Sequence, residues 1–326
     1  MAPAAAAPWD SSSSSSKTVC VMDAGGRLGS ALVHRLLQRG YTVHAALHNP
    51  QELVKSEKKQ LRVFQADPLD YHSVMEALKG CSALFYSFEL PADHPSYDEF
   101  MGEVEVRAAH NVLEACAQTE SIDKVVFTSS ATAIIWRDSQ PDVLSSQSHV
   151  DERNWSDINF CKKFKLWHGA SKTVAEKTAW ALAMDRGVNM VSINGGLLMC
   201  PDLSIKDPYL LGAAEMYRDG VFVTVDLKFL VDAHICVLED PSSYGRYLCF
   251  NRIINSTKDV LKLANRLVPS SSSPHSHPQM SSSMEGDNRV YQQRISNDKL
   301  SKLLVHFQSG VQVEWEAESC CSTTDS

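Results

Sequence analysis

The sequence predicts an α/β protein with a Rossmann-type doubly wound parallel sheet and a smaller C-terminal substrate lobe. Through about residue 195, short apolar strand-like segments alternate with amphipathic helix-like segments, which is the order that a parallel sheet with crossover helices requires. A glycine-rich turn follows the first strand and opens the first helix, as in dinucleotide-binding folds. The chain has 326 residues and 44% hydrophobic content, so it can bury the core that such a fold needs.

Each predicted element follows from apolar spacing and from the residues at its ends. The first strand, 18–22, is a buried apolar run, and the helix after it, 30–37, ends before Gly40, a suitable C-cap. The other segments of the sheet region are predicted as strands at 41–47, 61–66, 83–87, 124–128 and 189–194, and as helices at 73–79, 97–119 and 168–187. Beyond residue 194, helices are predicted at 208–217, 232–238, 257–267 and 297–307, and strands at 221–225, 245–251 and 311–315.

Composition divides the chain into a leader, a Rossmann domain, a lobe and a tail. The Ala-, Pro- and Ser-rich start lacks the basic region of a signal peptide and the arginines of a transit peptide, so a disordered leader is the better interpretation. His275 and His277 in a Ser-, Pro- and His-rich stretch could bind a metal, but a solvated insertion is favoured and no metal is predicted. The predicted boundaries are 1–16 for the leader, 17–195 for the Rossmann domain (continuing in part to 267), 196–316 for the substrate lobe with its insertion at 269–288, and 317–326 for a disordered tail.

Charge and cysteine usage restrict the partners and the compartment. A net charge of −8 disfavours nucleic acid as the partner, and the apolar runs are far shorter than a membrane span. The 9 cysteines include no C-x-x-C pair, so reduced thiols are expected rather than disulfides or zinc. We therefore expect a cytoplasmic monomer or weak dimer that acts on a small molecule.

The turn at 23–29 is the predicted site for a dinucleotide pyrophosphate. Glycines permit positive φ angles and close backbone approach, while a helix N-terminus offers unpaired N–H groups. Asp23 brings a carboxylate close to the phosphates, and Arg27 could offset its charge. The alternative is that the glycines only turn the strand into the helix. The residues predicted to contact the cofactor here are Asp23, Gly25, Gly26, Arg27, Leu28 and Gly29.

The end of the second strand favours NADP (as NADPH) over NAD. An acidic residue there would bind the ribose of NAD, but the segment 45–50 reads Ala-Ala-Leu-His-Asn-Pro and contains none. His48, Arg27 and the lysines within 55–59 supply positive charge nearby. As an alternative, these lysines are only solvated surface charge.

His168 and Lys172 form a second candidate site. Their spacing places them on one face of the helix predicted at 168–187, one turn apart. Alone, such a pair is usually a solvated helix face. The pair nevertheless resembles the catalytic Tyr-x-x-x-Lys signature of the short-chain dehydrogenase/reductase superfamily, with histidine at the tyrosine position.

The chain resembles the plant cinnamoyl-CoA reductases and dihydroflavonol reductases of the extended short-chain branch, above all a divergent cinnamoyl-CoA reductase-like subgroup. The segment 155–162, Trp-Ser-Asp-Ile-Asn-Phe-Cys-Lys, is specific to this plant group. The other matching segments are 40–43, 49–50, 66–70, 125–130, 151–152, 172–177 and 245–249.

The resemblance implies that NADPH reduces a hydroxycinnamoyl thioester to its aldehyde, with release of CoA, in lignin- or defence-related phenylpropanoid metabolism. It implies that Ser130 is the catalytic serine, that Lys172 is the catalytic lysine and that Asp67 lies by the adenine. The departures from the family pattern are Asp23 for the first glycine, His48 for the arginine at the 2′-phosphate, Arg107 for an asparagine, Gly195 for a proline and Phe229 for an aspartate.

The chemistry of His168 separates the functional hypotheses. Lys172 would keep the imidazole pKa below about 6.5, so the ring would be neutral and a poor proton donor. An imidazole also reaches roughly 2 Å less far than a phenol, and small misplacements are costly in catalysis. The favoured hypothesis is a slow NADPH-dependent reductase of phenylpropanoid thioesters or carbonyls. The alternatives are an inactive relative that binds NADP(H) or a phenylpropanoid ligand as a regulatory or interaction protein, and an interaction protein that binds no cofactor.

Overall fold

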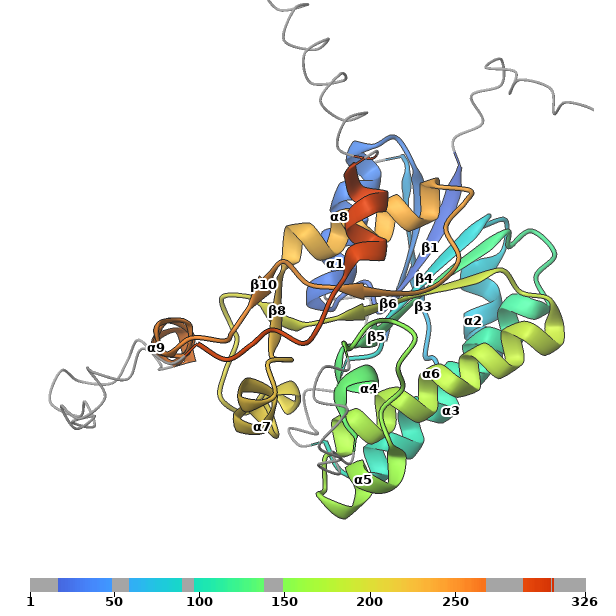
Figure 1. Ribbon diagram of the computed structural model, residues 1–326. Helices are drawn as coiled ribbons and strands as arrows, with labels where there is room; N and C mark the ends of the chain where they lie inside the picture. The colour runs from blue at the N-terminus through green and yellow to red at the C-terminus, as the bar shows by residue number, and fades with distance from the viewer. Residues whose placement is uncertain are drawn as a thin grey trace, which may run out of the picture.

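Two sheets organise the computed structural model, which describes residues 17–48, 59–89, 97–137, 149–267, 290–305 and 307 (Figure 1). The larger sheet has seven strands in the order β3-β2-β1-β4-β5-β6-β9, and every pairing in it is parallel. Its strands are β1 (Thr18–Met22), β2 (Thr42–Leu47), β3 (Leu61–Gln65), β4 (Ala83–Tyr86), β5 (Lys124–Ser130), β6 (Met190–Gly195) and β9 (Gly245–Cys249). The strand order reverses between β1 and β4, so the topological switch point lies at their carboxyl ends. The Rossmann-type fold predicted from the sequence is confirmed.

Helices cover both faces of this sheet (Figure 1). Successive residues of β1 enter opposite cores, with Val19 and Val21 in one and Cys20 and Met22 in the other, because side chains alternate along a strand. The first core is closed by α1 (Arg27–Gln38), by α8 (Leu227–Glu239) and by a helical segment at 298–305; the second is closed by α2 (Tyr71–Leu78), α3 (Glu99–Ala117) and α6 (Trp167–Arg186).

Helices α3 and α6 approach each other closely because small residues line their contact. A Cβ atom on Gly102 would lie 2.3 Å from the Ser171 Oγ, so this crossing has no room for a larger residue. Ala175 and Ala179 continue the buried face of α6. The first turn of α6, which carries His168, is thereby placed against α3.

The remaining elements form a smaller lobe beside the larger sheet (Figure 1). Its own sheet has three strands in the order β10-β8-β7. Tyr209, Met216 and Phe222 form a third core together with Trp136. The elements of the lobe are β7 (Leu197–Met199), the 3₁₀ helix η2 (Pro208–Leu210), α7 (Ala213–Arg218), β8 (Val223–Asp226), β10 (Arg252–Ile253) and α9 (Thr257–Leu267).

The structure departs from the predicted elements in the lobe and before α6. The prediction of a single helix at 208–217 is wrong, because Gly212 has a φ of 84° and separates η2 from α7. The sequence prediction also missed β7, β10, α4 (Thr132–Ile135) and α5 (Ile158–Lys163). For α5 a signal was present, since Asp157 caps it by accepting hydrogen bonds from backbone N–H groups of its first turn. The predicted leader 1–16, insertion 269–288, strand 311–315 and tail 317–326 lie outside the described residues.

Candidate active site

A cavity of about 130 Å³ lies at the switch point, between the carboxyl edge of the larger sheet and the lobe. Ser130 at the end of β5 lines it together with His168 and Lys172 from the first turns of α6. Arg27 and Leu28, at the start of α1, line the same cavity. The structure thus brings together the two candidate sites that the sequence predicts separately.

Ser130 and His168 are connected through Thr132. The Ser130 Oγ accepts hydrogen bonds from the backbone N–H of Thr132 at 3.2 Å and from its hydroxyl at 3.0 Å. The Thr132 Oγ1 lies 3.1 Å from Nδ1 of His168. Because the Thr132 hydroxyl has one proton and donates it to Ser130, we assign the His168 proton to Nδ1, which donates to Thr132. In the neutral ring, Nε2 then carries no proton.

The His168 ring is half-buried between aromatic side chains. It meets the Tyr97 ring edge-on, with 5.2 Å between ring centroids, and lies 6.2 Å from the Tyr209 ring. Loss of water around the imidazole, with the positive charge of Lys172 as a smaller cause, holds the pKa of His168 well below its usual value. His168 is therefore neutral at neutral pH, as the sequence-based argument expects.

Lys172 is buried and its charge is paired. Its Nζ donates to Glu105 Oε1 at 2.7 Å and to the Phe88 carbonyl at 3.2 Å. Glu105 is only 2% exposed, and burial raises the pKa of its carboxyl while Lys172 opposes that rise. The Tyr97 hydroxyl donates to the other carboxylate oxygen of Glu105. Tyr97, Glu105 and Lys172 thus form a second hydrogen-bonded series next to Ser130, Thr132 and His168.

Glu105 was not among the residues predicted from the sequence, although helical spacing could have indicated it. Met101, Ala108 and Val112 are buried on α3 at intervals of seven and four residues, and Glu105, four residues after Met101 and three before Ala108, falls on the same face. A carboxylate on an otherwise apolar helix face requires a buried partner. The Lys172 ammonium is that partner.

Arg27 lies among acidic groups from separate segments. Its Nε is 3.5 Å from Glu89 Oε2, in the segment after β4. Its Nη1 lies 3.9 Å from Asp202 Oδ2 and donates to the Cys200 Sγ at 3.1 Å. Asp207 lines the same cavity, and burial raises the pKa of its carboxyl. The guanidinium that could neutralise a pyrophosphate is therefore already in contact with protein carboxylates.

Comparison with known proteins decides the family. Residues 24–154 match the NAD(P)H-binding family model. The chain is 35% identical to cinnamoyl-CoA reductase 1 of Petunia hybrida over 308 aligned residues. This alignment covers 90% of this chain and 88% of the relative. The chain belongs to the cinnamoyl-CoA reductase family. Cinnamoyl-CoA reductase 1 of Arabidopsis thaliana is 33% identical, with 93% of this chain and 88% of the relative covered.

Solved structures of reductases share the fold of this cinnamoyl-CoA reductase family member. Vestitone reductase from alfalfa aligns with a TM-score of 0.62 at 22% identity, over 88% of this chain and 91% of that one. Yeast methylglyoxal/isovaleraldehyde reductase, complexed with NADPH, aligns with a TM-score of 0.63 at 16% identity, over 88% and 92%. The predicted family is confirmed, and the NAD(P)H-binding domain confirms the predicted class of cofactor.

The backbone of the glycine-rich turn fits the pyrophosphate of a dinucleotide. Asp23 has a φ of 61°, a left-handed conformation that aspartate tolerates better than most residues. A Cβ atom on Gly29 would lie 2.0 Å from the Asp23 carbonyl oxygen, so the turn requires glycine there. Gly26 is the N-cap of α1 and has no side chain to occupy the first N–H groups of the helix. The backbone geometry that a pyrophosphate requires is therefore present in this turn despite Asp23.

Gly195 lines this cavity, whereas four other residues predicted from the family pattern lie outside it. His48 is exposed directly after β2, and Asp67 follows β3, where its carboxylate accepts a backbone N–H of its own turn at 2.8 Å. Arg107 lines a separate cavity of about 360 Å³ between α3 and α6, so its substitution removes nothing from the active-site cavity. Phe229 packs against the core under α8. The roles of His48 and Asp67 stay predictions.

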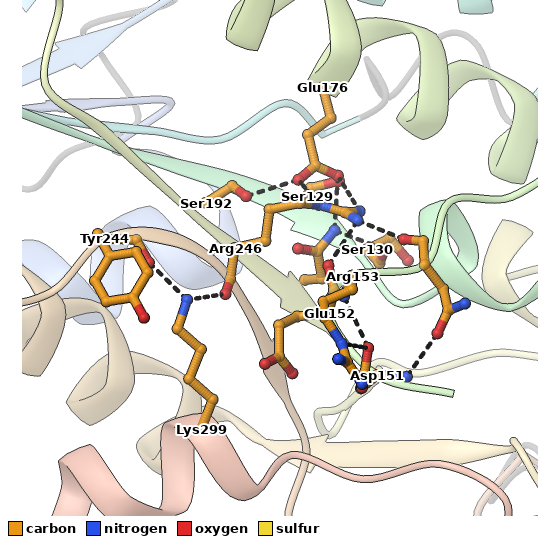
Figure 2. Close-up of polar contacts among 12 residues, drawn as sticks. Ser129, Ser130, Asp151, Glu152, Arg153, Glu176, Ser192, Tyr244, Arg246 and Lys299 are labelled. Atoms are coloured by element: carbon orange, nitrogen blue, oxygen red, sulfur yellow. Dashed lines mark hydrogen bonds and ion pairs between the residues drawn. The ribbon is translucent and has the colours of Figure 1, made fainter. Parts of the chain in front are cut away.

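A buried carboxylate network fixes the end of β5 that carries Ser130 (Figure 2). Glu176, one helical turn after Lys172, is 0% exposed and is paired with Arg246 Nε at 2.8 Å. Its side-chain partners are Ser129, Ser192, Asn194 and Arg246. Asn194 also donates to the Ser130 carbonyl at 3.2 Å. Because the Glu176 carboxylate receives hydrogen bonds from all four side chains, this network joins β5, β6, β9 and α6 and places Ser130. The Asn194 Oδ1 is buried without a hydrogen-bond partner among the described residues.

Two further observations concern metals and membranes. Within the described ranges, no group of three or more His, Cys, Asp or Glu side chains is arranged to hold a metal ion. In that same part of the chain, no helix has both the length and the apolar character needed to cross a membrane.

Proposed function

We propose that this protein is a slow NADPH-dependent reductase of phenylpropanoid thioesters or carbonyls, acting in the cytoplasm. The observation that carries the proposal is the hydrogen-bonded series Ser130–Thr132–His168 beside the buried ammonium of Lys172. These groups share one cavity with the glycine-rich turn. A carbonyl bound in the cavity would face Ser130, the serine that the family pattern makes catalytic. Family membership suggests that the reaction belongs to lignin- or defence-related metabolism.

The cofactor would be held by the turn and by the carboxyl edge of the sheet. When bound, it supplies the hydride for the carbonyl carbon. We assign the pyrophosphate to the backbone at Gly25 and Gly26 and to Arg27, the 2′-phosphate to His48, and the adenine to the neighbourhood of Asp67. The complete set of proposed cofactor contacts is Asp23, Gly25, Gly26, Arg27, Leu28, Gly29, His48, Asp67 and Lys172.

Ser130 is the better oxyanion donor of the two residues that meet the carbonyl oxygen in this proposal. Its Oγ accepts two hydrogen bonds from Thr132, which leaves its own proton for the developing oxyanion. His168 is neutral, and its Nδ1 proton is donated to Thr132, so it releases a proton poorly. Losing a general acid typically lowers a rate by about 10²–10⁴, which is why we propose slow turnover.

Two measurements test this proposal. NADPH fluorescence on titration with purified protein reports cofactor binding, and steady-state assays with feruloyl-CoA and cinnamyl-type aldehydes report reduction. We expect binding, together with measurable but slow oxidation of NADPH that depends on the carbonyl substrate. NADPH binding without substrate-dependent oxidation of NADPH would refute the proposed reductase activity.

A second candidate function is a non-catalytic NADP(H)- or phenylpropanoid-binding protein with a regulatory role. It is favoured by the pairing of Lys172 with Glu105, since a neutralised lysine activates a proton donor less. The cavity volume of about 130 Å³ is also below the range of roughly 300–1,000 Å³ typical of ligand pockets. The assays above separate this candidate from the reductase. Absence of NADPH binding would favour an interaction protein instead.

A further inference from the structure

Glu89 lies where a bound pyrophosphate would have to approach the glycine-rich turn. A Cβ atom on Gly26 would meet the carboxyl carbon and Oε1 of Glu89 at 3.1 Å each. The second oxygen of the same carboxylate is 3.5 Å from Arg27 Nε. One carboxylate therefore covers the N-cap residue of α1 and contacts the first residue of that helix.

The charge around Arg27 is predominantly negative. The Asp23 Oδ2 lies 2.8 Å from the same Cβ position on Gly26. Asp202 lies 3.9 Å from Arg27 Nη1, and Asp207 lines the cavity that Arg27 lines. A dinucleotide pyrophosphate would add two more negative charges to this group. It can therefore form an ion pair with Arg27 only by displacing a carboxylate.

We propose that Glu89 sets the affinity of this chain for its cofactor by acting as an internal competitor for the pyrophosphate. A carboxylate and a phosphate are stabilised by the same features, a guanidinium and the positive end of a helix dipole. Glu89 has both beside it, and it reaches them without the entropy loss that a free ligand incurs. The inference rests on the proposed cofactor function, and it adds the residue that weakens binding.

The test compares Glu89→Gln with Asp202→Asn. The first substitution removes the charge at Gly26 and Arg27 with little change of shape. The second removes another acid that contacts Arg27, but one whose side chain is 67% exposed. We expect Glu89→Gln to lower the NADPH dissociation constant roughly tenfold, as the loss of one close like charge at partial exposure allows. We expect Asp202→Asn to change it by less than about twofold, because solvent screens that charge.

A second ligand locates the effect. 2′-AMP carries the adenosine and the 2′-phosphate but no pyrophosphate, so its affinity should be the same in the wild type and in both variants. Glu89→Ser provides a second variant at the same position, and circular dichroism confirms that each variant is folded.

The outcomes separate this inference from the proposed function. Weak binding by the wild type and tighter binding by both Glu89 variants supports the role of Glu89 and the cofactor binding that the proposed function requires. Binding by the Glu89 variants alone supports the role of Glu89 and contradicts cofactor use by the natural chain. Equal NADPH affinity in the wild type and the Glu89 variants, or an equal gain for 2′-AMP, overturns the role of Glu89 whether or not the wild type binds.

Discussion

Unusual polar residues have opposite surroundings on the two sides of the cavity. On the catalytic side (Ser130, Thr132, His168, Lys172 and Glu105), the substituted histidine is hydrogen bonded to Thr132, and the lysine is paired with a buried carboxylate. On the cofactor side (Asp23, Gly26, Arg27 and Glu89), the carboxylates of Asp23 and Glu89 converge on Gly26. The first side has balanced charge, whereas the second has an excess of acids.

This difference shows that the effect of a substitution depends on its partners more than on its distance from the reaction. His168 alters the proton donor but fits its network. Asp23 preserves the backbone turn but adds charge where phosphates bind. We therefore expect variants on the catalytic side to change stability and turnover, and variants on the cofactor side to change binding.

The largest expected effect is on stability, from Lys172→Met. Removing the ammonium leaves the carboxylate of Glu105 buried without its ion-pair partner, and loss of one member of a buried pair typically costs about 3–5 kcal/mol. Urea denaturation measures the free energy of unfolding. Lys177→Met is the matched control, since Lys177 is exposed on the same helix and lies 5.1 Å from the centroid of the Trp155 ring, an arrangement worth about 1 kcal/mol or less. Equal losses for the two variants would contradict a balanced buried pair.

His168→Tyr should raise reductase turnover by at least about tenfold, because a phenol beside Lys172 restores a general acid of longer reach. The gain is smaller than a full recovery, since Glu105 already neutralises part of the Lys172 charge. Steady-state turnover with feruloyl-CoA measures it. His168→Phe supplies a ring without a proton donor and should show no gain. A turnover for His168→Tyr at or below the wild-type value, with NADPH affinity retained, would refute the prediction.

The sequence predicted the sheet well because its signals are local. The first strand and the long α3 and α6 have apolar spacing that a short window reveals, and the turn after the first strand is marked by its glycines. All are present in the structure. The lobe was predicted less well, since β7 and β10 are three and two residues long. Strands of that length have too few residues to show a period, and their existence depends on neighbouring strands.

The active site was also only partly predictable from the sequence. Ser130, His168 and Lys172 could be named from the sequence because motif spacing and family pattern mark them. Glu105 and Glu89 could not be connected to the site in that way, since each meets its partner across the fold: Glu105 to Lys172 is a separation of 67 residues. Which acid neutralises which cation is decided by helix crossing and loop position.

The acid sensitivity of the protein should come in part from His168. In the folded protein its pKa is well below the usual value, whereas the unfolded chain takes up the proton near pH 6.5. Below that pH the unfolded chain binds more protons, so stability falls as pH falls toward the folded pKa. His168→Gln should therefore lose less stability than the wild type between about pH 7.5 and 5.5, as measured by urea denaturation. His234, whose pKa burial lowers to about 4, contributes to both proteins alike.

Replacement of the exposed His34 by Gln is the control for this pH series. It should leave the loss of stability on acidification unchanged. An identical pH dependence for the wild type and His168→Gln would show that the ring takes up its proton in the folded protein as readily as in the unfolded chain, which contradicts the effect of burial and of Lys172 on its pKa.

The smallest expected effect is a gain in NADPH affinity from Asp23→Gly, by roughly threefold, because the substitution removes a like charge near the bound phosphates. Glycine also adopts the φ of 61° at this position without strain. Asp23→Asn separates the two causes, since it removes the charge and keeps a side chain that tolerates the left-handed conformation. Equal gains for both variants identify charge as the cause, and a gain for glycine alone identifies the backbone. No gain for either would show that the acidic character of the cofactor side comes from Glu89 rather than from Asp23.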